Sequence, residues 1–216
     1  MNIEPQGFCD TNIFVDFSLT DKFLNFIDKF KKLNIADAVH TELLDWSRDN
    51  YDYSYIYNNL IEQIEKENIL LIEFKKFSPL QKEIIERRLE GINELLENFS
   101  QEKKKHLNKG EIVSAVYAEV TNAPFIQSND KFPGELKNSE FKNIIFLDRR
   151  DILKELCVSF KEVEHYDREI NREREKMNVS FKKSKEVEKS KLPIDDNKKN
   201  DLLEFKEELK KKNSNN

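Results

Sequence analysis

The sequence has few of the residues that build disulfide-bonded or zinc-binding domains. It contains two cysteines and three histidines in 216 residues. Cys9 falls in an apolar run and Cys157 near the end of a well-patterned segment, so both are expected to be free, buried thiols. His40, His106 and His165 do not have the spacing of zinc ligands, and no Cys-x-x-Cys motif accompanies them. A structural zinc site and a redox role are therefore not expected.

Long apolar runs are also missing. No segment has the uncharged apolar length that a membrane-spanning helix requires. The N-terminus lacks the basic region followed by an apolar stretch that is typical of a signal peptide. We therefore expect a cytoplasmic protein without a membrane partner.

The composition provides enough apolar material for one core with a polar appendage, because hydrophobic residues are 38% and charged residues 37% of the chain. The apolar pattern thins out after Phe160, which predicts a folded domain over residues 1–160 and a charged extension over residues 161–216. The extension is interpreted as a solvated tail, or as a helix that docks on a partner or back onto the domain.

Charge is distributed unevenly along the chain. The net charge is −5, although residues 161–216 contain 16 basic and 14 acidic residues, so the acidic excess lies in the folded part. An acidic domain argues against a nucleic-acid partner, because phosphate contacts need cations. The objection weakens if some of the acids hold a divalent cation, which inverts the local field.

Strands and helices are expected to alternate, which predicts an α/β sandwich with a mainly parallel sheet. The near-continuous apolar run 69–74 predicts a strand in the interior of that sheet. Residues 34–37 are interpreted as a break between two helices. The other expected strands are 8–10, 125–128 and 144–147, and the expected helices are approximately 20–33, 39–46, 52–67, 78–105, 111–120 and 150–156.

Acidic residues recur where these elements meet. Asp10 ends the first strand, Asp130 follows the strand 125–128, and Glu111 opens the helix before that strand. The carboxyl ends of parallel strands line one edge of a sheet, so these three carboxylates are expected to converge, and Glu42 can join them. Each acid also has a purely structural interpretation, as a helix cap, an exposed helix residue, a partner of a helix dipole or a turn residue.

A carboxylate cluster of this kind favours a particular chemistry. Like charges repel unless a cation compensates them, and ligands that are all oxygen suit Mg²⁺ or Mn²⁺. Such an ion neutralises a phosphate oxygen and turns a water molecule into a nucleophile. The pattern therefore favours metal-assisted hydrolysis of phosphodiester bonds.

Four motifs, taken in order, resemble those of the PIN-domain family over roughly residues 6–157. The resemblance implies a PIN-like three-layer α/β sandwich around a central, mainly parallel sheet. The charged extension, which its composition predicts to be a helical or disordered tail, has no counterpart in these motifs. It also implies a ribonuclease site that depends on Mg²⁺ or Mn²⁺. The motifs are Cys9-Asp10-Thr11-Asn12, Val39-His40-Thr41-Glu42-Leu43, Gly110-Glu111 followed by Ala115 and Ala118, and Ile126-Gln127-Ser128-Asn129-Asp130-Lys131-Phe132.

The resemblance also implies roles for single residues and a kind of partner. Many PIN domains are toxins of bacterial toxin–antitoxin pairs and are inhibited by a small protein that covers the site, which implies an antitoxin partner. Family usage favours RNA as the substrate. A DNA-directed defence nuclease, a catalytically silent interaction module and a homo-oligomer are left open. The implied catalytic metal ligands are Asp10, Glu42, Glu111 and Asp130, and the residues that orient them are Thr11, Asn12 and Ser128.

Overall fold

The computed structural model describes residues 6–47, 51–99, 109–129 and 140–191. The chain divides into two compact units, Met1–Asn178 and Val179–Asn216. The first unit contains every strand of the described part of the chain and is the subject of the following paragraphs. In the second unit, residues 179–191 are helical and form the last part of a long helix, α9.

A parallel sheet forms the centre of the first unit. Its five strands have the order β3-β2-β1-β4-β5, and all four neighbouring pairs run parallel. The expected α/β sandwich with a parallel sheet is thus confirmed. The strands are β1 (Phe8–Cys9), β2 (Leu33–Ala36), β3 (Ile69–Ile72), β4 (Phe125–Gln127) and β5 (Ile145–Leu147).

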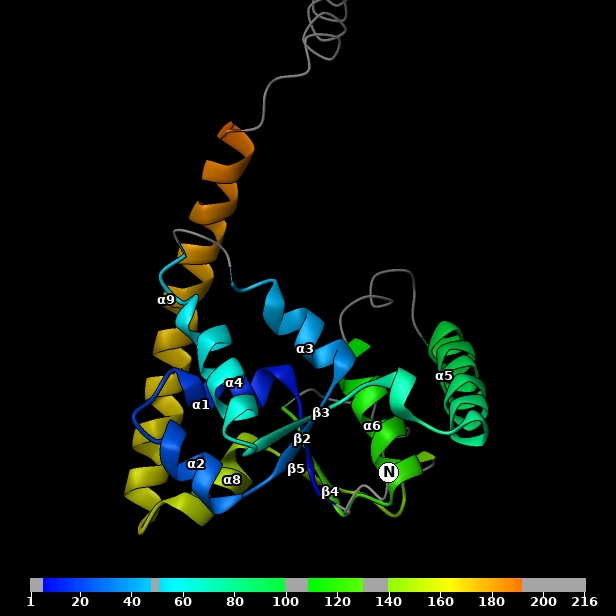
Figure 1. Ribbon diagram of the computed structural model, residues 1–216. Coiled ribbons are helices and arrows are strands. Elements are labelled where there is room, and N and C mark those ends of the chain that lie inside the picture. The colour runs from blue at the N-terminus through cyan, green and yellow to red at the C-terminus, as the bar shows by residue number, and fades with distance from the viewer. Residues whose placement is uncertain (1–5, 48–50, 100–108, 130–139, 192–216) are drawn as a thin grey trace, which may run out of the picture. The chain divides into compact units, whose positions relative to one another are not determined.

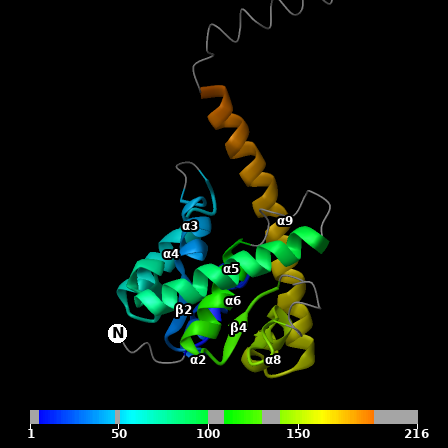
Figure 2. The same cartoon turned by 90° about the vertical axis from the view of Figure 1, so that its right-hand side faces the viewer.

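Helices cover both faces of this sheet and complete the three layers (Figure 1). Helices α5 and α6 lie on one face, and Figure 2 shows them in front of the sheet. Helices α1, α2, α4 and α8 lie on the other face, while α3 packs against α1 and α6. The helices are α1 (Thr11–Ser18), α2 (Phe23–Lys29), α3 (Asp37–Leu44), α4 (Tyr55–Glu65), α5 (Pro79–Phe99), α6 (Lys109–Thr121), α8 (Arg149–Leu156) and α9 (Phe160–Lys191), with the 3-10 turn η1 (Phe74–Lys76).

Strand β2 corrects the interpretation of residues 34–37 as a break between helices. All four of its residues are buried, and it pairs with β1 on one side and β3 on the other. Helix α2 ends at Lys29, although the apolar residues keep helical spacing from Phe23 as far as Leu33. That spacing concealed the end of the helix and the start of β2. Lys32 turns the chain with a φ of 63°, a left-handed conformation that the apolar pattern did not predict.

Strand β3 was also placed wrongly, because it forms an edge of the sheet rather than its interior. Its middle residues, Leu70 and Leu71, are only half-buried. Helix α1 was missed as well. Since seven of its eight residues are buried, it lacks the polar face that makes a helix recognisable in a sequence.

The beginning of α9 belongs to the first unit rather than to a separate extension. Val163, Ile170 and Met177 are buried and lie seven residues apart along the helix, so they face the same side. The Tyr51 hydroxyl donates to the Met177 carbonyl at 3.3 Å. The folded unit therefore extends to Asn178, beyond the boundary expected at residue 160. Residues 161–178, the beginning of the predicted extension, pack on this unit.

The predicted free thiols are confirmed, since Cys9 and Cys157 form no disulfide. Cys9 is buried and Cys157 is half-buried. Burial raises the pKa of both thiols, most strongly for Cys9, where the neighbouring Asp10 carboxylate acts in the same direction. Within the described ranges, no helix has the length and apolar character to cross a membrane.

Candidate functional site

Asp10 lies where the central strand β1 becomes helix α1. Its backbone N–H donates to the Gln127 carbonyl of β4 at 3.0 Å, which holds the two strand ends side by side. Its Oδ1 accepts from the Thr11 N–H at 2.7 Å, so the side chain caps α1. The residue is only 2% exposed. The structure therefore places this carboxylate at the carboxyl edge of the sheet, as expected from the sequence.

The Ser128 hydroxyl connects Asp10 with Glu111. Ser128 follows β4, and its Oγ lies 3.3 Å from Oδ2 of Asp10 and 3.0 Å from Oε1 of Glu111. Glu111 is in the first turn of α6, where the helix dipole favours a negative charge. Glu111 and Ser128 are each 1% exposed. Two buried carboxylates from different elements thus meet around one hydroxyl group.

Glu42 reaches the same region from α3. Its Oε2 accepts from the Thr11 hydroxyl and its Oε1 accepts from the Gly110 N–H at 2.8 Å. Thr11 follows Asp10 in the chain and Gly110 precedes Glu111, so Glu42 joins the first turns of the two helices that carry the buried carboxylates. A Cβ atom at Gly110 would lie 2.7 Å from Oε2 of Glu42, so this close contact depends on the absence of a side chain at position 110.

The oxygen donors around Ser128 are of the kind that Mg²⁺ and Mn²⁺ prefer. However, the described part of the chain contains no group of three His, Cys, Asp or Glu residues placed to hold a metal ion. Asp130, the fourth predicted ligand, lies outside the described residues. The structure thus brings Asp10 and Glu111 together and ties Glu42 to both through Thr11 and Gly110.

The predicted orienting residues have different surroundings. Ser128 contacts both buried carboxylates, and Thr11 contacts Glu42. Asn12 instead extends toward the long helix α9, where its Oδ1 accepts from the Arg174 guanidinium at 3.3 Å. Its position two residues after Asp10 did not indicate this contact, since Arg174 lies 162 residues further along the chain.

A second polar cluster, which includes the Arg174 contact of Asn12, was missed entirely. Asp16 of α1 is fully buried and forms ion pairs with Arg149 and Arg174. Burial raises the pKa of the Asp16 carboxyl, and the charges of Arg174 and Arg149 oppose that rise. Asp16 had one signal in the sequence, as the only charged residue in the apolar stretch 13–17. The arginines had none, because many charged residues surround each of them.

Comparison with known proteins gives little additional information. No protein-family model matches the sequence, and no curated protein matches it. Among solved structures, the chain is similar to a chain in the crystal structure of VapBC2 from Rickettsia felis bound to a DNA fragment from their promoter. That match has 17% identity and a TM-score of 0.43, and covers 66% of this chain and 97% of that one. The interpretation of the site therefore rests on its own geometry and sequence motifs.

Proposed function

We propose that this protein is a PIN-like endoribonuclease that hydrolyses phosphodiester bonds with the help of Mg²⁺ or Mn²⁺. The observation that carries the proposal is the meeting of two buried carboxylates, Asp10 and Glu111, around the Ser128 hydroxyl. Burying two negative charges so close together is costly, and a divalent cation would offset that cost. The sequence motifs that contain these residues are similar to those of PIN domains.

Some residues of the site would bind the ion, and others orient the ion-binding side chains. Asp10 and Glu111 would bind the ion, with Asp130 as a further ligand. When bound, the ion neutralises phosphate charge and activates water for attack on phosphorus. The Ser128 hydroxyl fixes the rotamers of the two carboxylates. Glu42 holds the first turns of α1 and α6 next to each other. The carboxylate ligands would therefore be oriented before an ion binds.

RNA is proposed as the substrate because of the resemblance to PIN domains, since phosphodiester chemistry is the same for RNA and DNA. The same resemblance supports an antitoxin protein as the partner. Such a partner would regulate the enzyme by covering the carboxyl edge of the sheet.

Cleavage assays on the full chain test the proposal. Labelled RNA and single-stranded DNA of the same sequence are incubated with the protein and Mn²⁺, Mg²⁺ or EDTA. Cleavage of RNA that needs the metal and disappears in Glu111→Gln is expected. Glu90→Gln, which changes an exposed carboxylate of α5, is the matched control and should remain active. Cleavage of DNA alone would contradict the RNA assignment, and full activity in Glu111→Gln would contradict the site.

A further inference from the structure

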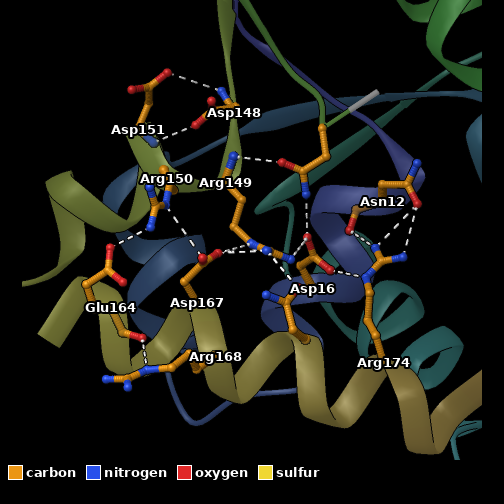
Figure 3. Close-up of polar contacts among 12 residues, drawn as sticks. Asn12, Asp16, Asp148, Arg149, Arg150, Asp151, Glu164, Asp167, Arg168 and Arg174 are labelled. Carbon is orange, nitrogen blue, oxygen red and sulfur yellow. Dashed lines mark hydrogen bonds and ion pairs between the residues drawn. The ribbon is translucent and has the colours of Figure 1, made fainter. Parts of the chain in front are cut away.

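Helix α9 contributes an arginine to a buried cluster that contacts Asn12 and Asn129, which lie close in sequence to Asp10 and Ser128. Asp16 has no exposed side-chain surface and lies between Arg149, which begins α8, and Arg174 of α9 (Figure 3). An Nη1 of Arg149 lies 3.3 Å from Oδ2 of Asp16, and the Arg174 Nε donates to Oδ1. Both arginine side chains are half-buried, with exposures of 16% and 26%. The cluster thus joins α1, α8 and α9 through one carboxylate.

The cluster forms hydrogen bonds with two segments of the proposed active site. On one side, the Arg174 Nη2 donates to the backbone carbonyl of Asn12 at 2.6 Å. On the other side, the Asn129 amide donates to the Asp16 carboxylate. The Oδ1 of Asn129 accepts from the Arg149 backbone N–H at 2.9 Å. Asn12 lies two residues after Asp10, and Asn129 lies next to Ser128. The network therefore connects the segment after β1 with the segment after β4.

The relative position of these two segments determines how far the Ser128 hydroxyl lies from the Asp10 carboxylate. The contact of 3.3 Å between Asp10 and the Ser128 hydroxyl depends on how the ends of β1 and β4 lie relative to each other. Backbone hydrogen bonds fix the strand ends as far as Asp10, whose N–H donates to the Gln127 carbonyl, and Ser128, whose N–H donates to the Leu147 carbonyl. Beyond these residues, the contacts of Asn12 and Asn129 with the cluster hold the two segments in place.

We infer that Arg174 is a positioning residue for the proposed reaction, which sets the geometry of the carboxylate site from helix α9. This inference rests on the proposed function. Arg174 has the chemistry for the role, because its planar guanidinium binds the Asp16 carboxylate and the Asn12 carbonyl at the same time. A lysine keeps the charge but lacks this fork of donors. The part of α9 that carries Arg174 is therefore required for the geometry of the proposed nuclease site.

Two variants of the full chain and one control test the inference. Arg174→Gln removes the charge, and Arg174→Lys keeps the charge beside Asp16 in case the first variant does not fold. Arg168→Gln is the matched control, since Arg168 lies on the same helix and its Nε donates to the Glu164 carbonyl of that helix (Figure 3). Hydrogen exchange, thermal unfolding and cleavage kinetics are measured for each protein.

In both Arg174 variants, amide exchange in residues 8–16 and 125–129 should accelerate about tenfold, while exchange in β3 is unchanged. Their kcat should fall about tenfold, while their KM should stay within a factor of about two of the parent value. This pattern is expected when the substrate still binds but the site carboxylates are displaced from their working positions. Equal acceleration in β3, or values like those of Arg168→Gln, would overturn the inference. If the parent does not cleave RNA, the proposed function fails, whereas the exchange data still decide whether Arg174 holds the two segments.

Discussion

Glu42 accepts a hydrogen bond of 2.8 Å from the backbone N–H of Gly110, 68 residues further along the chain. The absence of a side chain at Gly110 makes this contact accessible, because a Cβ atom there would lie 2.7 Å and 2.8 Å from the two carboxylate oxygens. The contact fixes the residue before Glu111 and so determines where that carboxylate enters the site. It leads to a prediction that separates function from stability.

Gly110→Ala should impair the site without unfolding the protein. The displaced atoms are the end of the flexible Glu42 side chain, and alanine favours a helix over glycine by about 1 kcal/mol. We expect a free energy of unfolding within about 1 kcal/mol of the parent and a loss of RNA cleavage of about 10- to 100-fold. Urea unfolding and cleavage rates measure the two effects.

Gly91→Ala is the control for this change. Gly91 lies within α5, and a Cβ atom there would meet nothing within 4 Å. The substitution should raise the free energy of unfolding by about 0.5–1 kcal/mol and leave cleavage unchanged. Parent-like cleavage by Gly110→Ala would show that Glu42 is not needed where the structure places it.

Ser128→Ala should weaken metal binding. The substitution removes the hydroxyl that contacts Asp10 and Glu111, so the two carboxylates lose a shared donor and their fixed rotamers. An affinity for Mn²⁺ lower by about 10- to 100-fold is expected from isothermal titration calorimetry.

Ser114→Ala provides the comparison, since Ser114 is another buried serine, one turn after Glu111. Its hydroxyl has no hydrogen-bond partner among the residues that the structure describes. Replacing it by alanine should therefore be neutral or stabilising, without effect on Mn²⁺ affinity. Equal affinities in the two variants would argue against a role for Ser128 in orienting the ligands.

Ile170→Ala should destabilise the whole first unit. Ile170 is fully buried on α9, and truncating such a side chain costs about 2–5 kcal/mol. Val158→Ala, at a position that is 97% exposed, should change the free energy of unfolding by less than about 0.5 kcal/mol. Urea unfolding tests both. A small effect of Ile170→Ala would mean that residues 161–178 do not pack on the domain in solution.

Acid should weaken the attachment of α9 to Lys22, the residue before α2. Lys22 forms a 2.8 Å ion pair with Glu162, and this hydrogen bond, with the N–H of Val158, lowers the pKa of the Glu162 carboxyl from 4.5. The unfolded chain then binds the proton more tightly, so the stabilisation is present above pH 4.5 and is lost as the pH falls through the folded pKa.

Unfolding of Glu162→Gln across this acidic range measures the contribution. The difference in free energy of unfolding between parent and variant should shrink as the pH falls below 4.5. Glu175→Gln, an exposed position on the same helix, is the control. A difference that stays constant with pH would contradict the assigned pKa shift.

The sequence allowed the sheet edge and its carboxylates to be predicted because their signals are local. Asp10 directly follows a buried strand, and Glu111 lies in the first turn of a helix, so the parallel topology brings them near each other. Ser128 was predicted as an orienting residue from its motif, whereas its contact with both carboxylates became visible only in the structure.

The parts that could not be predicted depend on tertiary contacts. Helix α1 and strand β2 are buried on all sides, which removes the alternation of polar and apolar residues that identifies an element. Arg174 lies 158 residues from Asp16 and has acidic neighbours on both sides in the sequence. Only the folding of α9 onto the domain distinguishes it from the other charged residues of that helix.

Calorimetric titration of Mn²⁺ into the full chain and into Asp10→Asn tests the central claim most directly. Asparagine keeps an oxygen that can cap α1, so the variant should remain folded and be at least as stable as the parent. We predict that the parent binds Mn²⁺, and that Asp10→Asn loses this binding together with RNA cleavage. Failure of the parent to bind Mn²⁺, or equal binding by parent and variant, would contradict the account.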